Sequence, residues 1–213
     1  MDIVRWFLEF ILHIDRHLVE LTAAYGAFTH AILFLIIFVE TGFVITPFLP
    51  GDSLLFAAGA LASLGTLNII FLWLLLVLAA VLGDTVNYWI GNLVGSKVFK
   101  QDKGLFFNKN HLKHTQGFYE KYGAKTIILA RFVPIVRTFA PFVAGIGKMK
   151  YPTFLTYNII GGIAWVTLFV WGGYFFGNLP LIKEHFSLMI IAIIILSIVP
   201  LVTEVARNSR KKV

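Results

Sequence analysis

The chain of 213 residues contains no cysteine, and charged residues make up only 14% of it. The absence of cysteine excludes disulfide bonds, thiolate chemistry and thiolate metal sites. Apolar residues are in excess: 58% of the chain is hydrophobic, and the mean hydropathy is +0.83. This composition is typical of a polytopic membrane protein. Because one span needs about 20 apolar residues, we expect a handful of passes in a single membrane domain, residues 1–213.

The sequence also lacks the motifs on which several classes of enzyme depend. It has no Walker loop, no His-Glu-x-x-His pair and no Ser/His/Asp order. We therefore expect a protein that is not an enzyme and that uses no cofactor and no metal ion.

The formal net charge of +7 comes mainly from two clusters. Between residues 97 and 125 there are seven lysines, and the tail 207–212 is the second basic cluster. Short basic loops beside apolar spans mark the cytoplasmic side of a membrane. We therefore predict a cytoplasmic loop over 96–125, a cytoplasmic C-terminus and some attraction to anionic lipids. Nucleic acid is not an expected partner.

The apolar segments predict the topology. Residues 1–28 mix apolar and charged residues at a helical period, as an amphipathic interfacial helix does. With loop 96–125 and the tail in the cytoplasm, segment 126–147 starts and ends on the same side and is therefore re-entrant. With a cytoplasmic N-terminus, segment 46–65 is re-entrant from the opposite face. We predict an all-α polytopic membrane protein with transmembrane helices, two re-entrant hairpins and an amphipathic N-terminal helix.

Two sequence matches, each 86 positions apart, indicate an internal repeat. Phe56-Ala-Ala-Gly59 recurs as Phe142-Val-Ala-Gly145, and Tyr88-Trp-Ile-Gly91 recurs as Tyr174-Phe-Phe-Gly177. The topology gives the two copies opposite orientations. Inverted repeats whose broken elements meet near the midplane are an architecture of secondary transporters. We predict repeat 1 over 29–95 with a span at 67–95, repeat 2 over 126–178 with a span at 151–178, and a final transmembrane helix over 186–206.

Four ionisable residues lie inside the apolar segments: Glu40, Asp52, Arg131 and Arg137. An isolated charge at mid-bilayer costs about 2.5–3.5 kcal/mol even on a lenient insertion scale, so we expect the acids and the arginines to compensate one another. Guanidinium binds phosphate through a planar fork, which predicts a lipid-phosphate site at the two arginines. The alternative is that the arginines only pair with the acids and lock the two hairpins together.

The acids suggest a route to proton coupling. Burial raises the pKa of a carboxyl group, and a nearby arginine lowers it. We hypothesise that Glu40 or Asp52 takes up a proton when the arginines hold phosphate and releases it when the phosphate leaves.

A further set of residues is predicted to shape the hairpins or a cavity. On an unbroken helix Arg131 and Arg137 would point to different faces, but Pro134 breaks the helix and allows them to converge. Asp84 is a fifth ionisable residue in an apolar segment, and we expect it to line the cavity or to hydrogen-bond a hairpin. The other members of this set are Pro47, Pro50, Gly51 and Pro141.

Three segments of the chain resemble the bacterial DedA family of the VTT-domain (SNARE-associated) superfamily: Glu40-Thr-Gly, Pro47-Phe-Leu-Pro50-Gly51-Asp52-Ser53 and Arg131-Phe-Val-Pro134-Ile-Val-Arg137-Thr. The resemblance covers nearly the whole chain. It implies a multi-pass protein of the bacterial inner membrane with two re-entrant hairpins in an inverted repeat. It also implies movement of lipids between leaflets, undecaprenyl phosphate or phosphatidylethanolamine in bacteria, and dependence on the proton motive force. The family's acidic pair maps onto Glu40 and Asp52, and its arginine pair onto Arg131 and Arg137.

Three functions remain open at this point. The first is a lipid translocase, a flippase or scramblase, with phosphate bound at the arginines. The second is a proton-coupled antiporter of small cations or drugs that uses the acids as its substrate site, and the third is a non-transporting membrane assembly factor. Two arginines favour an anionic substrate. The expected partners are membrane lipids and protons; alternating access in so small a protein needs either a homodimer or strong local thinning of the bilayer.

Overall fold

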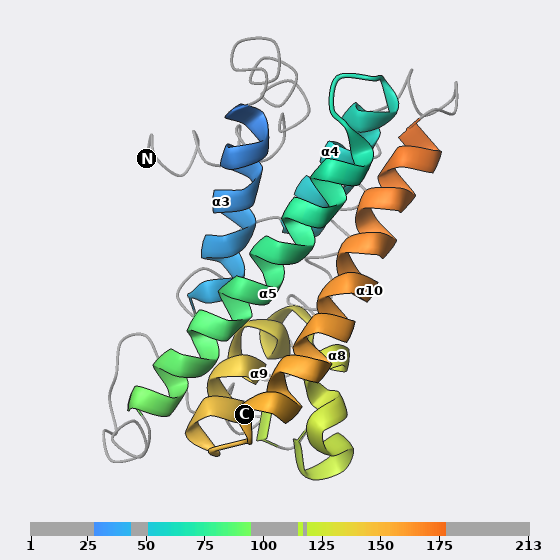
Figure 1. The fold of residues 1–213 in the computed structure, drawn as a ribbon. Coiled ribbons are helices and arrows are strands. Elements are labelled where there is room, and N and C mark those ends of the chain that lie inside the picture. The colour runs from blue at the N-terminus through green and yellow to red at the C-terminus, as the bar shows by residue number, and fades with distance from the viewer. Residues whose placement is uncertain (1–27, 44–50, 95–114, 117–118, 178–213) are drawn as a thin grey trace, which may run out of the picture. The chain divides into compact units, whose positions relative to one another are not determined.

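The computed structural model describes residues 28–43, 51–94, 115–116 and 119–177 (Figure 1). All regular elements within these ranges are helices: α3 Phe28–Gly42, α4 Gly51–Ser63, α5 Ile69–Val94, the 3-10 helix η1 Gly123–Lys125, α8 Thr126–Ala130, α9 Pro134–Ile146 and α10 Tyr151–Gly177. The prediction of an all-helical chain is confirmed for this part. Pro47, Pro50, the predicted helix 186–206 and most of segments 1–28 and 96–125 lie outside the described residues.

Two of the helices are long and apolar enough to cross a membrane. Helix α5 has 26 residues and α10 has 27. At a rise of about 1.5 Å per residue each is about 40 Å long, which exceeds the hydrocarbon thickness of about 30 Å. Both carry large apolar side chains on exposed positions, among them Leu74, Leu78 and Phe175, as a lipid-facing surface does. The predictions of spans at 67–95 and 151–178 are confirmed as helices of suitable length and composition.

The remaining described helices are short. Helix α3 has 15 residues, and α4 and α9 have 13 each. A helix of 13 residues is about 20 Å long, well under the hydrocarbon thickness of about 30 Å. Neither α4 nor α9 is therefore long enough to cross a bilayer by itself.

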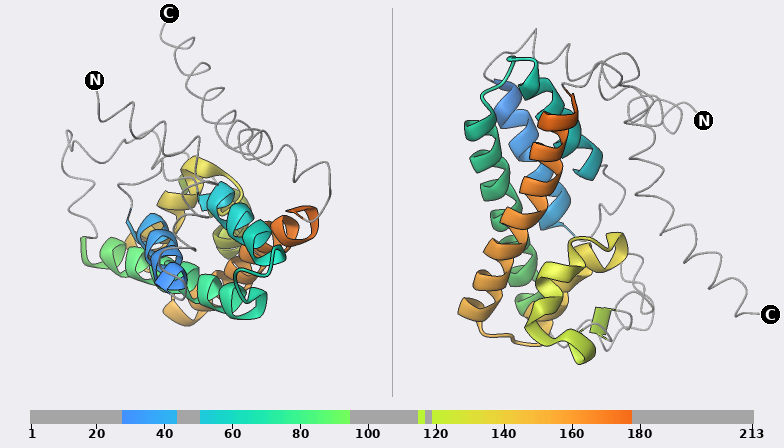
Figure 2. Two further views of the ribbon diagram at one scale, coloured as in Figure 1. Left: turned by 90° about the horizontal axis from the view of Figure 1, so that it is seen from above. Right: turned by 90° about the vertical axis from the view of Figure 1, so that its right-hand side faces the viewer.

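The chain divides into two compact units, and both long helices pass from one to the other. The first unit comprises residues 1–34, 50–76 and 166–213, and the second comprises 35–49 and 77–165. The first thus holds α4 with the start of α5 and the end of α10. The second holds α8 and α9 with the end of α5 and the start of α10. Figure 2 shows these helices from two further directions.

In the first unit, α4 packs against the C-terminal part of α10 through two glycines. A Cβ atom added at Gly59 would lie 2.8 Å from the carbonyl carbon of Val170, and one added at Gly173 would lie 2.8 Å from that of Phe56. No larger residue fits between the two backbones, which is how small residues act at crossings of membrane helices.

In the second unit, α9 packs against the C-terminal part of α5 in the same manner. A Cβ atom at Gly91 would lie 2.9 Å from the carbonyl carbon of Phe142, and one at Gly145 would lie 2.7 Å from the backbone nitrogen of Asn92. Gly145 therefore has the role in this unit that Gly59 has in the first, as their sequence match predicts. The glycines on the long helices do not match in the same way. Gly91 of α5 matches Gly177 in sequence, but the glycine of α10 at the crossing with α4 is Gly173, one helical turn earlier.

Candidate functional site: a buried arginine and carboxylate cluster

A break between α8 and α9 positions the two arginines. Arg131 follows the last residue of α8, and Pro134 is the first residue of α9. Between them Val133 is extended, with φ −122° and ψ 105°, because a residue before proline is forced out of the helical region. Arg137 then lies one turn into α9, where its backbone N–H donates to the Val133 carbonyl at 2.9 Å. The predicted effect of Pro134 on helical regularity is present.

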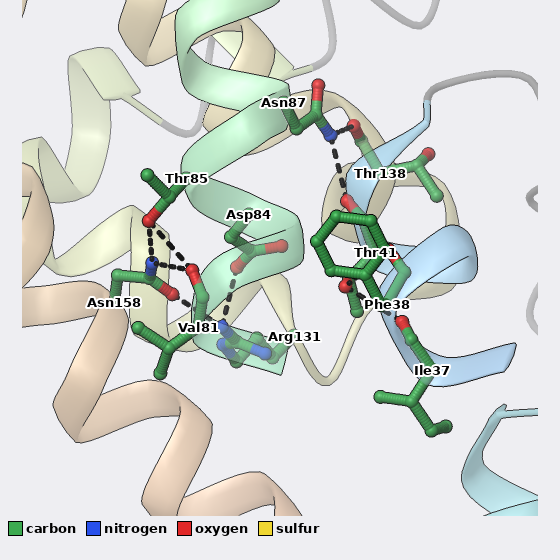
Figure 3. A network of polar contacts seen from close by, with 10 residues as sticks. All are labelled: Ile37, Phe38, Thr41, Val81, Asp84, Thr85, Asn87, Arg131, Thr138 and Asn158. Carbon is green, nitrogen blue, oxygen red and sulfur yellow. Dashed lines mark hydrogen bonds and ion pairs between the residues drawn. The ribbon is translucent and has the colours of Figure 1, made fainter. Parts of the chain in front are cut away.

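Arg131 lies at the centre of a polar network inside the second unit (Figure 3). Its Nη2 donates to Asp84 Oδ2 of α5 at 2.6 Å and to Asn158 Oδ1 of α10 at 2.6 Å. The three residues are only 3%, 4% and 0% exposed. Asn158 is held in turn by its Nδ2, which donates to the Val81 carbonyl at 3.0 Å. A single guanidinium nitrogen thus joins two long helices to the α8–α9 break.

Two glycines of α10 make room for the Arg131 side chain. A Cβ atom at Gly161 would lie 3.2 Å from both Cδ and Nε of Arg131. One at Gly162 would lie 3.1 Å from Val81 Cγ2 and 3.6 Å from Arg131 Nη2. The pair therefore forms the wall against which the guanidinium and its stem lie.

Arg137 has a different carboxylate partner. Its Nη2 donates to Glu40 Oε1 of α3 at 3.0 Å, and the two side chains are 10% and 6% exposed. The pair joins α9 to the C-terminal end of α3. It is less deeply buried than the pair of Arg131 and Asp84, whose side chains are 2% and 5% exposed.

Both guanidinium groups lie over one indole ring. The Cζ atom of Arg137 is 4.1 Å from the ring centroid of Trp165, and that of Arg131 is 5.8 Å away. Trp165 is completely buried. A desolvated cation over an indole face is stabilised by about 2 kcal/mol, and this attraction needs no anion. Trp165 thus holds the two arginines near each other independently of their carboxylate partners.

Asn87 ties the helices around the cluster together (Figure 3). Its Nδ2 donates to the Thr41 carbonyl of α3 at 3.2 Å and to the Thr138 carbonyl of α9 at 2.9 Å. The Thr41 side chain packs closely over Gly83 of α5, where a Cβ atom would also lie 2.8 Å from the Phe38 carbonyl oxygen. Asn87, which lies within one helical turn of Asp84, therefore connects α3, α5 and α9 by hydrogen bonds and packing, and each of these helices carries a charged member of the cluster.

Tyr119 is a further polar residue near the cluster. Its hydroxyl group donates to the Ala140 carbonyl of α9 at 2.9 Å. Burial, and secondarily the charge of Asp84, raises the pKa of Tyr119 well above its ordinary value. The phenol is therefore protonated and acts as a hydrogen-bond donor throughout the physiological range.

The cluster lies close to the middle of α5. Asp84 is two to three residues past the middle of α5, which is about 4 Å along the axis at 1.5 Å per residue. The hydrocarbon extends about 15 Å on either side of the midplane. Removing one partner of a buried ion pair costs about 3–5 kcal/mol, because an uncompensated charge is left behind. Within the second unit, the two ion pairs, Arg131 with Asp84 and Arg137 with Glu40, balance in charge when all four groups are ionised.

Within the second unit, the structure brings together four of the residues that the sequence singled out. Arg131, Arg137 and Glu40 lie in one cluster, and Asp84 joins them as the ion-pair partner of Arg131. Asp52 lies in the first turn of α4, next to Gly51 and inside the other compact unit. The expectation that the acids Glu40 and Asp52 compensate the arginines is therefore incomplete, since Asp84 provides the closest carboxylate to Arg131. Pro141 lies inside α9.

The sequence gives little indication of two members of the cluster. Asn158 is the only amide side chain in the 27-residue helix α10, and this is the one signal that could have identified it. No sequence pattern distinguishes Trp165 from tryptophans that pack in a core or anchor a helix at the membrane interface. Among the described residues, no group of three or more His, Asp or Glu side chains is arranged to hold a metal ion.

The fold and the cluster define a helical membrane protein with paired charges inside its hydrophobic region. Comparison with known proteins agrees with this class, because residues 49–175 match the VTT domain. The chain is 56% identical over 212 residues to Protein DedA of Escherichia coli K12, covering 99% of this chain and 97% of that protein. The chain belongs to the DedA family of VTT-domain membrane proteins.

More distant relatives are also membrane proteins. The chain is 43% identical over 194 residues to a membrane protein of Mycobacterium tuberculosis H37Rv, with 89% of this chain and 85% of that protein covered. It is 30% identical over 171 residues to the inner membrane protein YqjA of E. coli K12, with coverages of 80% and 78%. No solved structure matches the chain.

Proposed function

We propose that this protein is a lipid translocase, a flippase or scramblase that moves a phosphate-bearing lipid between the leaflets of the bacterial inner membrane. Undecaprenyl phosphate and phosphatidylethanolamine are the candidate substrates. The observation that carries the proposal is the pair of buried guanidinium groups, held over the Trp165 ring beside exchangeable carboxylates. The printed name of YqjA, an inner membrane protein, supports the location.

The chemistry of the cluster suits an anionic head group. A phosphate oxygen and a carboxylate oxygen accept the same charge-assisted hydrogen bonds from guanidinium. A lipid phosphate can therefore replace Glu40 or Asp84 on an arginine without leaving a donor unpaired. A cationic substrate would have to displace the arginines instead, and Trp165 holds both of them in place.

We propose an inverted repeat with two re-entrant hairpins as the framework for this transport. Two observations support it: the described helices α4 and α9 are both too short to span, and each crosses a long helix through paired glycines. In this topology the N- and C-termini and the basic loop are cytoplasmic. Such repeats place substrate sites near the midplane, at the broken elements.

Proton coupling is part of the proposal. A lipid phosphate that enters a neutral cluster brings net negative charge, and protonation of a carboxylate removes that charge. Glu40 and Asp52 are the carboxylates predicted for this role from the sequence. No enzymatic activity and no cofactor or metal ion is invoked, and the partners are membrane lipids, protons and, where transport needs it, a second copy of the chain.

Leaflet exchange of labelled lipids in proteoliposomes tests the proposal. Undecaprenyl phosphate and phosphatidylethanolamine are compared, each with and without a pH gradient, for the wild type, Arg137→Ala and Arg131→Lys. Lys121→Ala, which removes an exposed cation outside the cluster, is the matched control. Dilution to one chain per vesicle measures whether a homodimer is required.

We expect Arg137→Ala to abolish exchange and Lys121→Ala to leave it unchanged. Arg131→Lys keeps the charge but loses the planar fork. Loss of a charged hydrogen bond costs about 1.5–3 kcal/mol, so transport should fall about tenfold or more. If the folded wild type exchanges neither lipid, the translocase proposal fails, and the cation antiporter or the assembly factor takes its place. Exchange of a labelled small cation for protons would identify the former.

A further inference from the structure

Arg131 uses only part of its hydrogen-bonding capacity. Its Nη2 serves both Asp84 and Asn158, whereas Nε and Nη1 are buried and donate to no acceptor in the part of the chain that the structure describes. A guanidinium offers five donors, arranged in forks that match two oxygens of one anion. Asp84 reaches it through one oxygen only, at Oδ2. The contact is therefore a partial one, and an anion with three or four oxygens would satisfy more of the same donors.

Asp84 can leave Arg131 without releasing it. Asn158 accepts from the same Nη2 at 2.6 Å and is fixed by its own bond to the Val81 carbonyl. Trp165 lies beneath the guanidinium, and Gly161 lies against its stem. These three contacts involve no charged partner, so they persist when the carboxylate withdraws.

The charged groups around Asp84 determine whether the negative charge of an incoming anion is compensated. Arg131 is the ion-pair partner of Asp84. Arg137 and Tyr119 also lie close enough to interact electrostatically with the Asp84 carboxylate. Glu40 is engaged by Arg137. The charges of these two ion pairs sum to zero, and a singly ionised phosphate added to them would leave one uncompensated negative charge. Because Asp84 and Arg131 form the more deeply buried pair, the penalty for that charge is largest at Asp84.

We infer that Asp84 is the proton-carrying group of the transport cycle: the lipid phosphate takes its place on Arg131, and the freed carboxylate accepts one proton from water. This inference rests on the proposed function and assigns the proton to a residue other than Glu40 or Asp52. The balance is one proton bound for each negative charge admitted, so the cluster stays neutral. A protonated carboxyl group also becomes a donor and can bond the phosphate it admitted. When the phosphate leaves, Asp84 returns the proton to water and pairs with Arg131 again.

Binding of dodecyl phosphate to the purified full-length protein in a maltoside detergent provides the test. Infrared difference spectra are recorded on addition of dodecyl phosphate to wild-type protein labelled with carbon-13 aspartate. The label separates aspartate carboxyl groups from that of Glu40. Asp52→Asn then separates the two candidate aspartates. This measurement needs no substitution at Asp84, so it stands even if Asp84→Asn fails to fold.

The inference predicts a protonated-carboxyl band that appears on binding, shifts with the aspartate label and persists in Asp52→Asn. Linkage adds a second measurement, because uptake of one proton makes the dissociation constant rise tenfold for each pH unit over the range where free Asp84 is ionised. Asparagine at position 84 resembles the protonated carboxyl group. In folded Asp84→Asn, the slope of the logarithm of the dissociation constant for dodecyl phosphate against pH should therefore be smaller by one. Folded Asp52→Asn, the matched neutralisation of the other candidate aspartate, should retain the wild-type slope.

The outcomes separate the inference from the proposed function. A band that does not shift with the label, or that vanishes in Asp52→Asn while dodecyl phosphate still binds, overturns the role of Asp84 and leaves the phosphate site standing. An unchanged slope in folded Asp84→Asn overturns it as well. If the wild type neither binds dodecyl phosphate nor exchanges lipid, the proposed function itself is wrong, and the inference falls with it.

Discussion

Two adjacent glycines of α10, Gly172 and Gly173, provide a direct test of the helix crossing in the first unit. A Cβ atom at Gly173 would lie 2.8 Å from the Phe56 carbonyl carbon and 3.1 Å from the Ala60 backbone nitrogen. A Cβ atom at Gly172 would meet only the ring of Phe56, at 3.7 Å, which is ordinary van der Waals contact. The two positions are neighbours in one helix, but Gly173 is buried and Gly172 only partly buried, and they differ in what they touch. We predict that Gly173→Ala destabilises the protein and that Gly172→Ala does not.

The magnitude follows from two opposing effects. Alanine is favoured over glycine in a helix interior by about 0.8–1.0 kcal/mol, and this gain is common to both variants. At Gly173 the new methyl group meets backbone, which cannot rotate away, and overpacking of this kind costs about 1–3 kcal/mol. Since carbon atoms prefer a separation of about 3.5–4.0 Å, α4 would have to move by about 1 Å. The two variants should therefore differ by about 1–3 kcal/mol in their free energy of unfolding.

The assay is unfolding in mixed detergent micelles, followed by circular dichroism at several mole fractions of denaturing detergent. Gly172→Ala is the matched control, and we expect it to be as stable as the wild type or slightly more so. Equal midpoints for the two variants would refute the close backbone approach of α4 and α10. A loss of stability in Gly172→Ala alone would show that the contacts are assigned to the wrong face of α10.

Three further predictions concern the surroundings of the arginine cluster. Trp165→Phe should retain lipid exchange within about threefold, whereas Trp165→Leu, which removes the aromatic face and about 2 kcal/mol of cation–π attraction, should reduce it about tenfold or more in the proteoliposome assay. Asn87→Leu removes the donor shared by the Thr41 and Thr138 carbonyls, and the loss of stability should be about 1–3 kcal/mol in the micelle unfolding assay; an unchanged midpoint would contradict this cross-link. Because burial raises the pKa of Tyr119, its favourable contribution is complete below about pH 10 and is lost as the pH rises through its folded value. The melting temperature of Tyr119→Phe should therefore depend less on pH than that of the wild type above about pH 10, and parallel curves would argue against the buried phenol.

Hydropathy and length were sufficient to predict the long helices. Segments 67–95 and 151–178 were predicted as spans, and α5 and α10 follow them within a few residues. Pro134 allowed one further feature to be predicted from the sequence, the helix break between Arg131 and Arg137. Local chemistry determines both features, so a single sequence contains them. The pairing of α4 with one part of α10 depends on contacts between residues more than 100 positions apart, and glycine spacing alone does not specify the partner.

The partner of Arg131 could not be deduced in the same way. Glu40 and Asp52 flank a stretch of sequence that contains Pro47 and Pro50, which draws attention to them, whereas Asp84 follows Gly83 in an otherwise continuous apolar helix. Which acid reaches which arginine is decided by helix rotation and by the room that Gly161 leaves. A one-residue rotation of α5 turns a side chain by about 100°, and no sequence pattern fixes rotation to that accuracy.

The arrangement of the cluster bears on the kind of substrate that it can take. Besides its ion pair, each arginine has a contact that carries no charge, the indole of Trp165, and Arg131 also has the amide of Asn158; each carboxylate is ion-paired to an arginine. Exchange of one anion for another therefore leaves the positions of Arg131 and Arg137 unchanged. Exchange of a cation would require an arginine to leave both its carboxylate and the indole. The cluster thus favours anion exchange over cation exchange, and a lipid phosphate is an anion that the membrane itself supplies.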